Sequence, residues 1–225
     1  MRFGVGNVGN VGRGLTLAAL LTGLVTGCGA EDADPDTASG KGTARTSAKV
    51  AERGGSVGAS GSACELPVSF DIAEFWKAEA VDTAEATAAA GDLAELVDVF
   101  ARQGPVTMAC EIDAKPAGKI GFLRVWTGKP GDADARAVLE AFVAAEPEAS
   151  GAKYSTFEAG DVTGAEVEYV TTSKVLEESK TEHALAVTTS AGPVVLHLGG
   201  LDTDEHNAML PAYELAKSTL RPTAA

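Results

Sequence analysis

The chain has 225 residues and is acidic, with 32 Asp and Glu against 18 Lys and Arg and a formal net charge of −14 at pH 7. This balance argues against nucleic acid as a partner, because that affinity depends on cationic side chains that neutralise phosphates. It also argues against docking of the protein surface itself on anionic lipid headgroups.

The first 28 residues are built like a secretory signal. Arg2 and Arg13 supply positive charge, and the apolar run 15–25 follows without a charged residue. This run is shorter than the roughly 18 apolar residues expected of a membrane-spanning helix. It ends in the sequence LVTGC at residues 24–28, which resembles the lipobox of bacterial lipoproteins.

The lipobox resemblance implies that residues 1–27 are a lipoprotein signal peptide that is removed. The sulfur of Cys28 would then carry a diacylglyceryl group, and this acylated N-terminus would hold the protein at the cell membrane, on the extracytoplasmic face. Two acyl chains anchor a protein firmly, whereas one anchors it only marginally. A plain secretory signal with a coincidental cysteine is the alternative.

The stretch that follows Cys28 is predicted to be a disordered tether, so that residues 28–63 comprise the acylated N-terminus and this tether. Val50 and Val57 are its only large aliphatic residues, which is too few to bury the apolar surface that would offset chain entropy. Residues 64–222 are predicted to form a single globular domain that folds as a monomer without a metal or cofactor.

Three amphipathic helices are predicted in this domain, each with an apolar face that can pack against a sheet: 93–100, 135–142 and 209–220. Asp92 and Glu95 offer a capping box at the first helix, and Asp202 and Glu205 offer one ahead of the last. Pro211 leaves two alternatives for the last helix, which are a start after residue 206 or a kink.

Strand-like runs lie between these helices. The predicted strands are 66–72, 76–81, 106–112, 119–127, 153–158, 164–170, 183–189 and 193–198. Residues 120–126 and 194–198 are apolar on both faces, which is typical of central strands that are covered on each side. Because short turns separate neighbouring strands, the sequence predicts an α+β fold with a largely antiparallel sheet flanked by helices.

The order of elements and three short segments resemble a known family. The segments 64–70, 120–126 and 198–202 are similar to those of actinobacterial lipoproteins with a PsbP-like domain of the LpqN type. The resemblance implies a PsbP-like fold and a non-enzymatic role as an assembly factor or binding module. It brings no catalytic residues to this chain.

Two cysteines remain once Cys28 is acylated, and they are predicted to form a disulfide. Cys64 and Cys110 lie on the apolar parity of their strands, and export would place them in an oxidising compartment. The alternative is that both are buried free thiols that act as small hydrophobic residues.

Several motifs that look chemical lack the structural context that their chemistry needs. The glycine pattern at 4–9 would have to follow a strand to bind a dinucleotide, and Ser56 in the pattern at 54–58 would have to lie on a strand-to-helix turn to act as a nucleophile. His183, His197 and His206 are too far apart in sequence to show metal-ligand spacing. No catalytic residue, metal site or cofactor is therefore predicted.

Arg124 is the most interesting polar residue, because it lies between Phe122 and Trp126 on one face of a predicted strand. One interpretation is a structural arginine whose stem packs while its guanidinium pairs with an acid such as Glu111. The other is a cation that lines a ligand pocket together with Phe122 and Trp126.

These observations favour a non-catalytic, lipid-anchored lipoprotein that acts as a binding or assembly module in the cell envelope. Its partners would be the membrane, through the N-terminal lipid, and an envelope protein or a cell-wall component. The first alternative is a small-ligand-binding lipoprotein with a pocket near Arg124 and Trp126. A less favoured alternative is an envelope hydrolase that uses carboxylates.

Overall fold

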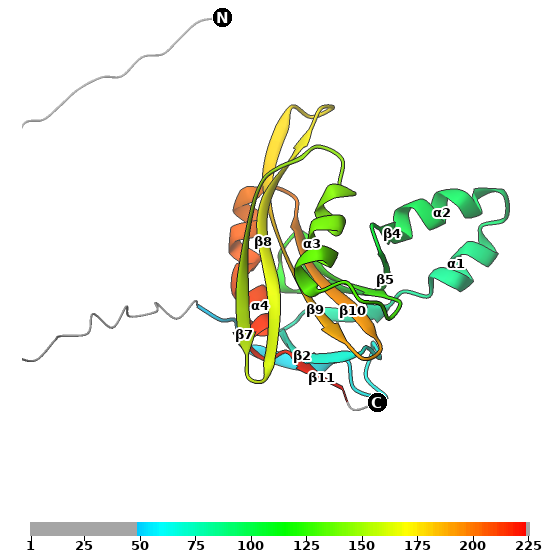
Figure 1. The fold of residues 1–225 in the computed structure, drawn as a ribbon. Helices are drawn as coiled ribbons and strands as arrows, with labels where there is room; N and C mark the ends of the chain where they lie inside the picture. The colour runs from blue at the N-terminus through cyan, green and yellow to red at the C-terminus, as the bar shows by residue number, and fades with distance from the viewer. Residues whose placement is uncertain (1–48, 224–225) are drawn as a thin grey trace, which may run out of the picture. The chain divides into compact units, whose positions relative to one another are not determined.

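The computed structural model describes residues 49–223, so the predicted signal peptide, Cys28 and the predicted tether up to residue 48 lie outside the described residues. Antiparallel strands form the two sheets around which the described part is built (Figure 1). The larger sheet has eight strands in the order β3-β5-β6-β10-β9-β8-β7, with β4 paired to β5. A smaller sheet has the order β1-β2-β11.

The strands are β1 (Arg53–Val57), β2 (Val68–Ala73), β3 (Lys77–Ala80), β4 (Arg102–Gln103), β5 (Val106–Asp113), β6 (Gly121–Gly128), β7 (Ala149–Ala159), β8 (Val162–Ser173), β9 (Glu178–Thr189), β10 (Gly192–Gly200) and β11 (Arg221–Pro222). The α-helices are α1 (Thr83–Ala89), α2 (Ala94–Ala101), α3 (Ala135–Ala144) and α4 (Thr203–Ser218). The α+β class with a largely antiparallel sheet is confirmed, and β6 and β10 are neighbours in the interior of the larger sheet, as their apolar sequences predicted.

Two apolar cores lie on opposite faces of the larger sheet, because successive side chains of a strand point to opposite sides. On β10, Leu196 and Leu198 join the core that also contains side chains of β2 and α4. Val195, which has the opposite parity, joins the second core, where Val138 and Phe142 of α3 cover the sheet. The helix α3 is short, so it covers only part of its face, and the hollow described below lies beyond its C-terminal end.

The last helix starts at Thr203, directly after Asp202 of the predicted capping box, so the alternative of a start after residue 206 is wrong. The side chain of Asp202 caps it by accepting a hydrogen bond of 2.8 Å from the backbone N–H of Glu205. Pro211 lies inside the helix, and its carbonyl accepts a hydrogen bond from the N–H of Ala51. Through this bond, α4 fixes the chain just ahead of β1.

The prediction that the stripe at 93–100 packs against the sheet is wrong. The helices α1 and α2 instead form an arm that projects from the sheet (Figure 1). On this arm Leu96 is 51% exposed and Phe100 is 72% exposed. The expected capping box is also absent, because no side chain caps α2, whereas Asp82 caps the unpredicted helix α1.

The boundary between tether and domain at residue 64 is also wrong. Residues 53–57 form β1, which pairs with β2, and the side chain of Val57 is buried in the first core. Residues of low hydropathy join the fold here because backbone pairing to β2, rather than their own apolar surface, holds them. Ser56 accordingly lies within a strand and on no strand-to-helix turn.

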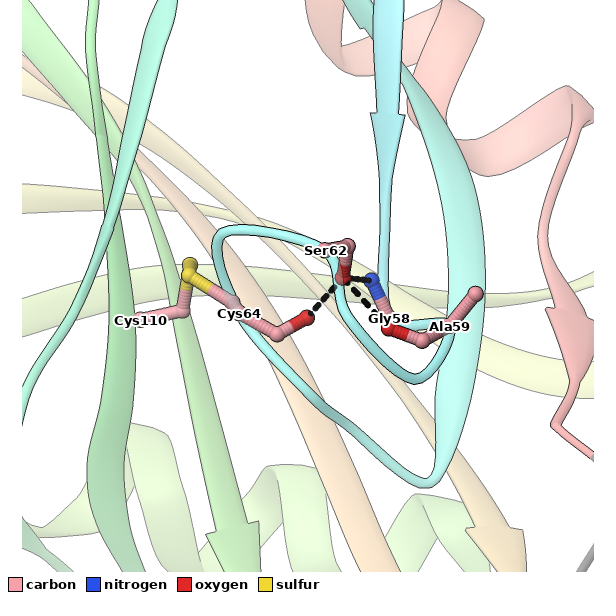
Figure 2. The surroundings of a disulfide bond; sticks show 5 residues. All are labelled: Gly58, Ala59, Ser62, Cys64 and Cys110. Carbon is pink, nitrogen blue, oxygen red and sulfur yellow. Dashed lines mark hydrogen bonds between the residues drawn. A yellow bond between two sulfur atoms is a disulfide. The ribbon is translucent and has the colours of Figure 1, made fainter.

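Cys64 and Cys110 form the predicted disulfide, which links the loop ahead of β2 to β5 of the larger sheet (Figure 2). Both cysteines are buried, at 1% and 0% exposure. The hydroxyl of Ser62 supports the loop: it accepts a hydrogen bond from the N–H of Gly58 and lies 2.7 Å from the carbonyl oxygen of Cys64 (Figure 2). The disulfide thus connects the two sheets covalently.

Candidate functional site

A hollow of about 560 Å³ opens on the face of the larger sheet that α3 covers only in part. Side chains of β6, β9 and β10 form its polar lining, and α2 and the loops after α3 and β10 contribute to its rim. The three residues predicted for a ligand pocket, Phe122, Arg124 and Trp126, all line this hollow. They share a face because they alternate along β6.

Arg124 fits both interpretations that the sequence left open. Its Nε donates a hydrogen bond of 2.8 Å to Oε2 of Glu111 on the neighbouring strand β5, and its guanidinium lies 4.7 Å from the centroid of the Phe122 ring. Within residues 49–223, however, its two Nη amino groups have no hydrogen-bond partner. The ion pair holds the guanidinium in place while these donors stay free.

Glu182 is the most buried charged residue of the hollow, and both of its oxygens accept charge-assisted bonds. Lys180 approaches Oε1 at 2.7 Å, and Nε2 of His197 approaches Oε2 at 2.8 Å. Burial raises the pKa of Glu182, but the interactions with His197 and Lys180 lower it by more and hold this pKa at about 2. Lys180 also donates to the carbonyl of Gly200, and the Tyr169 hydroxyl lies 3.1 Å from the same His197 nitrogen.

Glu146, just beyond the C-terminus of α3, is the second carboxyl group that lines the hollow. Burial raises its pKa, and the negative charge of Glu182 raises it further, although His197 and Lys180 oppose the shift. The two carboxyl groups are therefore pushed in opposite directions: Glu182 stays ionised, and Glu146 protonates more readily than an exposed glutamate.

Trp126 is 5% exposed, and its indole N–H is buried without an acceptor among the described residues, so a ligand in the hollow does not reach it. Gly199, in contrast, leaves room for an occupant. Gly199 carries no side chain where one would contact Oε2 of Glu182 and Cε1 of His197 at ordinary distances of 3.5 and 3.6 Å. A larger residue at position 199 would therefore project into the hollow without a backbone clash.

Four residues of the hollow, namely Lys180, Glu182, Glu146 and Gly199, were not predicted from the sequence. A signal for Glu182 was present, because it shares its parity on β9 with Ala184 and Ala186, which are buried. A charged residue on a buried parity needs a partner, and that requirement points to a polar site. Glu146 gives no comparable signal, since it follows a helix and reaches the hollow only through the tertiary fold.

His183 and His206, which show no metal-ligand spacing in the sequence, meet on the opposite face of the sheet. Nδ1 of His183 lies 2.7 Å from Nε2 of His206, and the rings stack with centroids 4.9 Å apart. Among residues 49–223 no group of three or more His, Cys, Asp or Glu side chains is arranged to hold a metal. Burial lowers the pKa of both rings, that of His206 to about 4.

This histidine pair should make the fold sensitive to mild acid. A histidine with a lowered pKa in the folded state binds protons more readily in the unfolded state. The free energy of unfolding is therefore highest above about pH 6.5 and falls as the pH drops toward the folded-state pKa of His206, about 4. We expect a loss on the order of 2 kcal/mol between pH 7.5 and pH 5, measured by urea denaturation. His206→Gln should flatten this decline, and an unchanged slope would contradict the assignment.

The comparisons with known proteins bear on the family of this chain. In the described part of the chain, no helix has the length and hydropathy to cross a bilayer. No curated protein matches the sequence significantly. The solution structure of cyanobacterial PsbP (CyanoP) from Synechocystis sp. PCC 6803 is similar at 12% identity and a TM-score of 0.44, covering 75% of this chain and 98% of that one. A protein family described as uncharacterised lipoprotein matches residues 34–220, and the chain belongs to this lipoprotein family.

Proposed function

We propose that the protein is a non-catalytic binding module of the cell envelope, held on the extracytoplasmic face of the membrane by a lipid on Cys28. The hollow beside α3 is its binding site. The observation that carries this proposal is a concave site in which the Nη groups of Arg124 are donors without acceptors among the described residues. Ligand sites are typically concave and present a few convergent polar groups.

The arrangement of carboxyl groups supports binding rather than hydrolysis. Lys180 and His197 occupy both oxygens of Glu182, and its pKa is held at about 2, so this group is poorly placed to take up or release a proton at neutral pH. Glu146 then lacks a free carboxylate partner in the hollow lining, and a hydrolytic pair needs two groups with different roles. The module would resemble the PsbP-like domains of actinobacterial lipoproteins, and it would act as a monomer.

Membrane attachment through Cys28 can be tested in the producing cell. Cys28→Ala should block acylation and leave the precursor uncut by the lipoprotein-specific peptidase, because the sulfur that receives the lipid is gone. Detergent-phase partitioning and the mass of the mature N-terminus measure this outcome. If the variant were processed normally and still partitioned into detergent, the anchor would lie elsewhere.

A photo-crosslinking amino acid at Leu201 tests the hollow as the binding site, because this residue is 62% exposed and lines it. Irradiation of cells should give a specific adduct from position 201. The control position is Glu158, an exposed residue on β7 outside the hollow, which should give none. Equal adducts from both positions, or none from 201, would overturn the proposed site.

A further inference from the structure

The unsatisfied groups in the hollow specify what a ligand must bring. The two Nη amino groups of Arg124 are donors, and neither has an acceptor within residues 49–223. The acceptors of Glu182, in contrast, are taken by Lys180 and His197. The ligand must therefore supply acceptor oxygens, and the planar guanidinium fork matches the paired oxygens of a carboxylate or phosphate.

The local charges tolerate such an anion. Glu111 and Arg124 neutralise each other through Nε, and Glu182 is neutralised by Lys180. Glu146 is the remaining carboxyl group of the lining, and burial raises its pKa. A ligand oxygen group at the Nη face of Arg124 would thus meet a fixed cation, while the carboxylates of Glu111 and Glu182 are already paired.

The rim of the hollow is apolar and faces solvent. Phe100 on the projecting arm, Ile120 ahead of β6 and Leu201 after β10 all line it and are 72%, 54% and 62% exposed. Exposed apolar side chains grouped around a polar site commonly mark a surface that a ligand covers. An occupant with an apolar body could bury these three side chains while its polar end reaches Arg124.

We propose that the hollow binds an organic acid in which a carboxylate or phosphate monoester is joined to an apolar body. The acid group is held by the Nη groups of Arg124, and the body lies against the apolar rim. This inference rests on the proposed function, since it names the class of ligand for the same site.

Titration calorimetry tests this class with residues 28–225 carrying Cys28→Ala, a chain that has neither the signal segment nor a lipid, in detergent-free buffer. The probes are octanoate, octyl phosphate, octanol and octyltrimethylammonium, which share one apolar body. We expect at least one of the two anions to bind about tenfold or more tightly than octanol, with the cation weakest. A preference between octanoate and octyl phosphate identifies which acid group the site takes.

Three variants separate the anion site from a structural role. Arg124→Gln should weaken anion binding about tenfold or more, whereas Arg136→Gln on exposed α3 surface outside the hollow should leave it unchanged. Glu111→Gln should tighten anion binding, because it removes the anion that competes for Arg124, and a structural role alone would not produce this gain. Thermal melts verify that each variant is folded.

Equal binding of octanol and the anions, no binding of any probe, or equal effects of Arg124→Gln and Arg136→Gln would overturn the proposed ligand class. In any of these cases, a specific adduct from position 201 in cells would still support the hollow as a binding site. Failure of the crosslinking as well would remove the proposed function itself.

Discussion

Removing the disulfide by the double substitution Cys64→Ala and Cys110→Ala should lower the free energy of unfolding by about 4 kcal/mol. The bond closes a loop with a sequence separation of 46 residues, and a loop of this size restricts the unfolded chain by roughly that amount in the chain-entropy model. Urea denaturation at neutral pH measures the change, with the slope compared between variants because the unfolded state becomes less restricted.

Reduction provides the matched control for this experiment. The wild-type chain treated with dithiothreitol should approach the stability of the double variant, and thiol labelling of the denatured, unreduced chain should find neither Cys64 nor Cys110 free. A double variant within about 1 kcal/mol of the wild type would mean that the link between the two sheets contributes little beyond their apolar contacts.

Glu182→Ala should destabilise the fold by about 3 kcal/mol, because it leaves Lys180 and His197 without the buried carboxylate that they contact. Lys180 is partly exposed and can turn toward solvent, but the side chain of His197 is only 10% exposed. The matched control is Glu140→Ala, which removes the partner of Arg136 from a half-exposed ion pair on α3. Such exposed pairs contribute about 0–1 kcal/mol.

Urea denaturation of both variants decides this prediction. If Glu182→Ala and Glu140→Ala lowered the free energy of unfolding by the same small amount, Glu182, Lys180 and His197 would be solvated rather than held in a fixed arrangement. The acceptors of Glu182 would then be available, and a ligand could bring donors instead.

Periodicity predicted the sheet well because burial decides where apolar residues fall along a strand. The strands β5, β6, β8 and β10 lie close to their predicted ranges, and the order of strands explains why β6 and β10 are apolar on both faces. The same parity placed Cys64 and Cys110 in the interior and put Phe122, Arg124 and Trp126 on one face.

Periodicity does not detect elements that are held by backbone pairing or by their position in the fold. Residues 53–57 have little apolar surface, and they form β1 because β2 offers a free edge. Conversely, the apolar stripe of α2 predicted a buried face, but the arm leaves Leu96 and Phe100 exposed. Lys180 and Glu146 join the hollow from β9 and from the end of α3, an encounter between distant segments that local spacing does not encode.

We expect the hollow beside α3 to be occupied in the cell. Native mass spectrometry of the full-length protein, gently extracted from its own membranes, tests this occupancy directly. Wild-type protein should carry the added mass of a bound ligand. Gly199→Leu, which fills the hollow, should lose this mass, whereas Gly55→Leu on β1, where a Cβ also meets only ordinary contacts, should keep it. The same added mass on all three proteins, or no added mass on any of them, would contradict occupancy of the hollow.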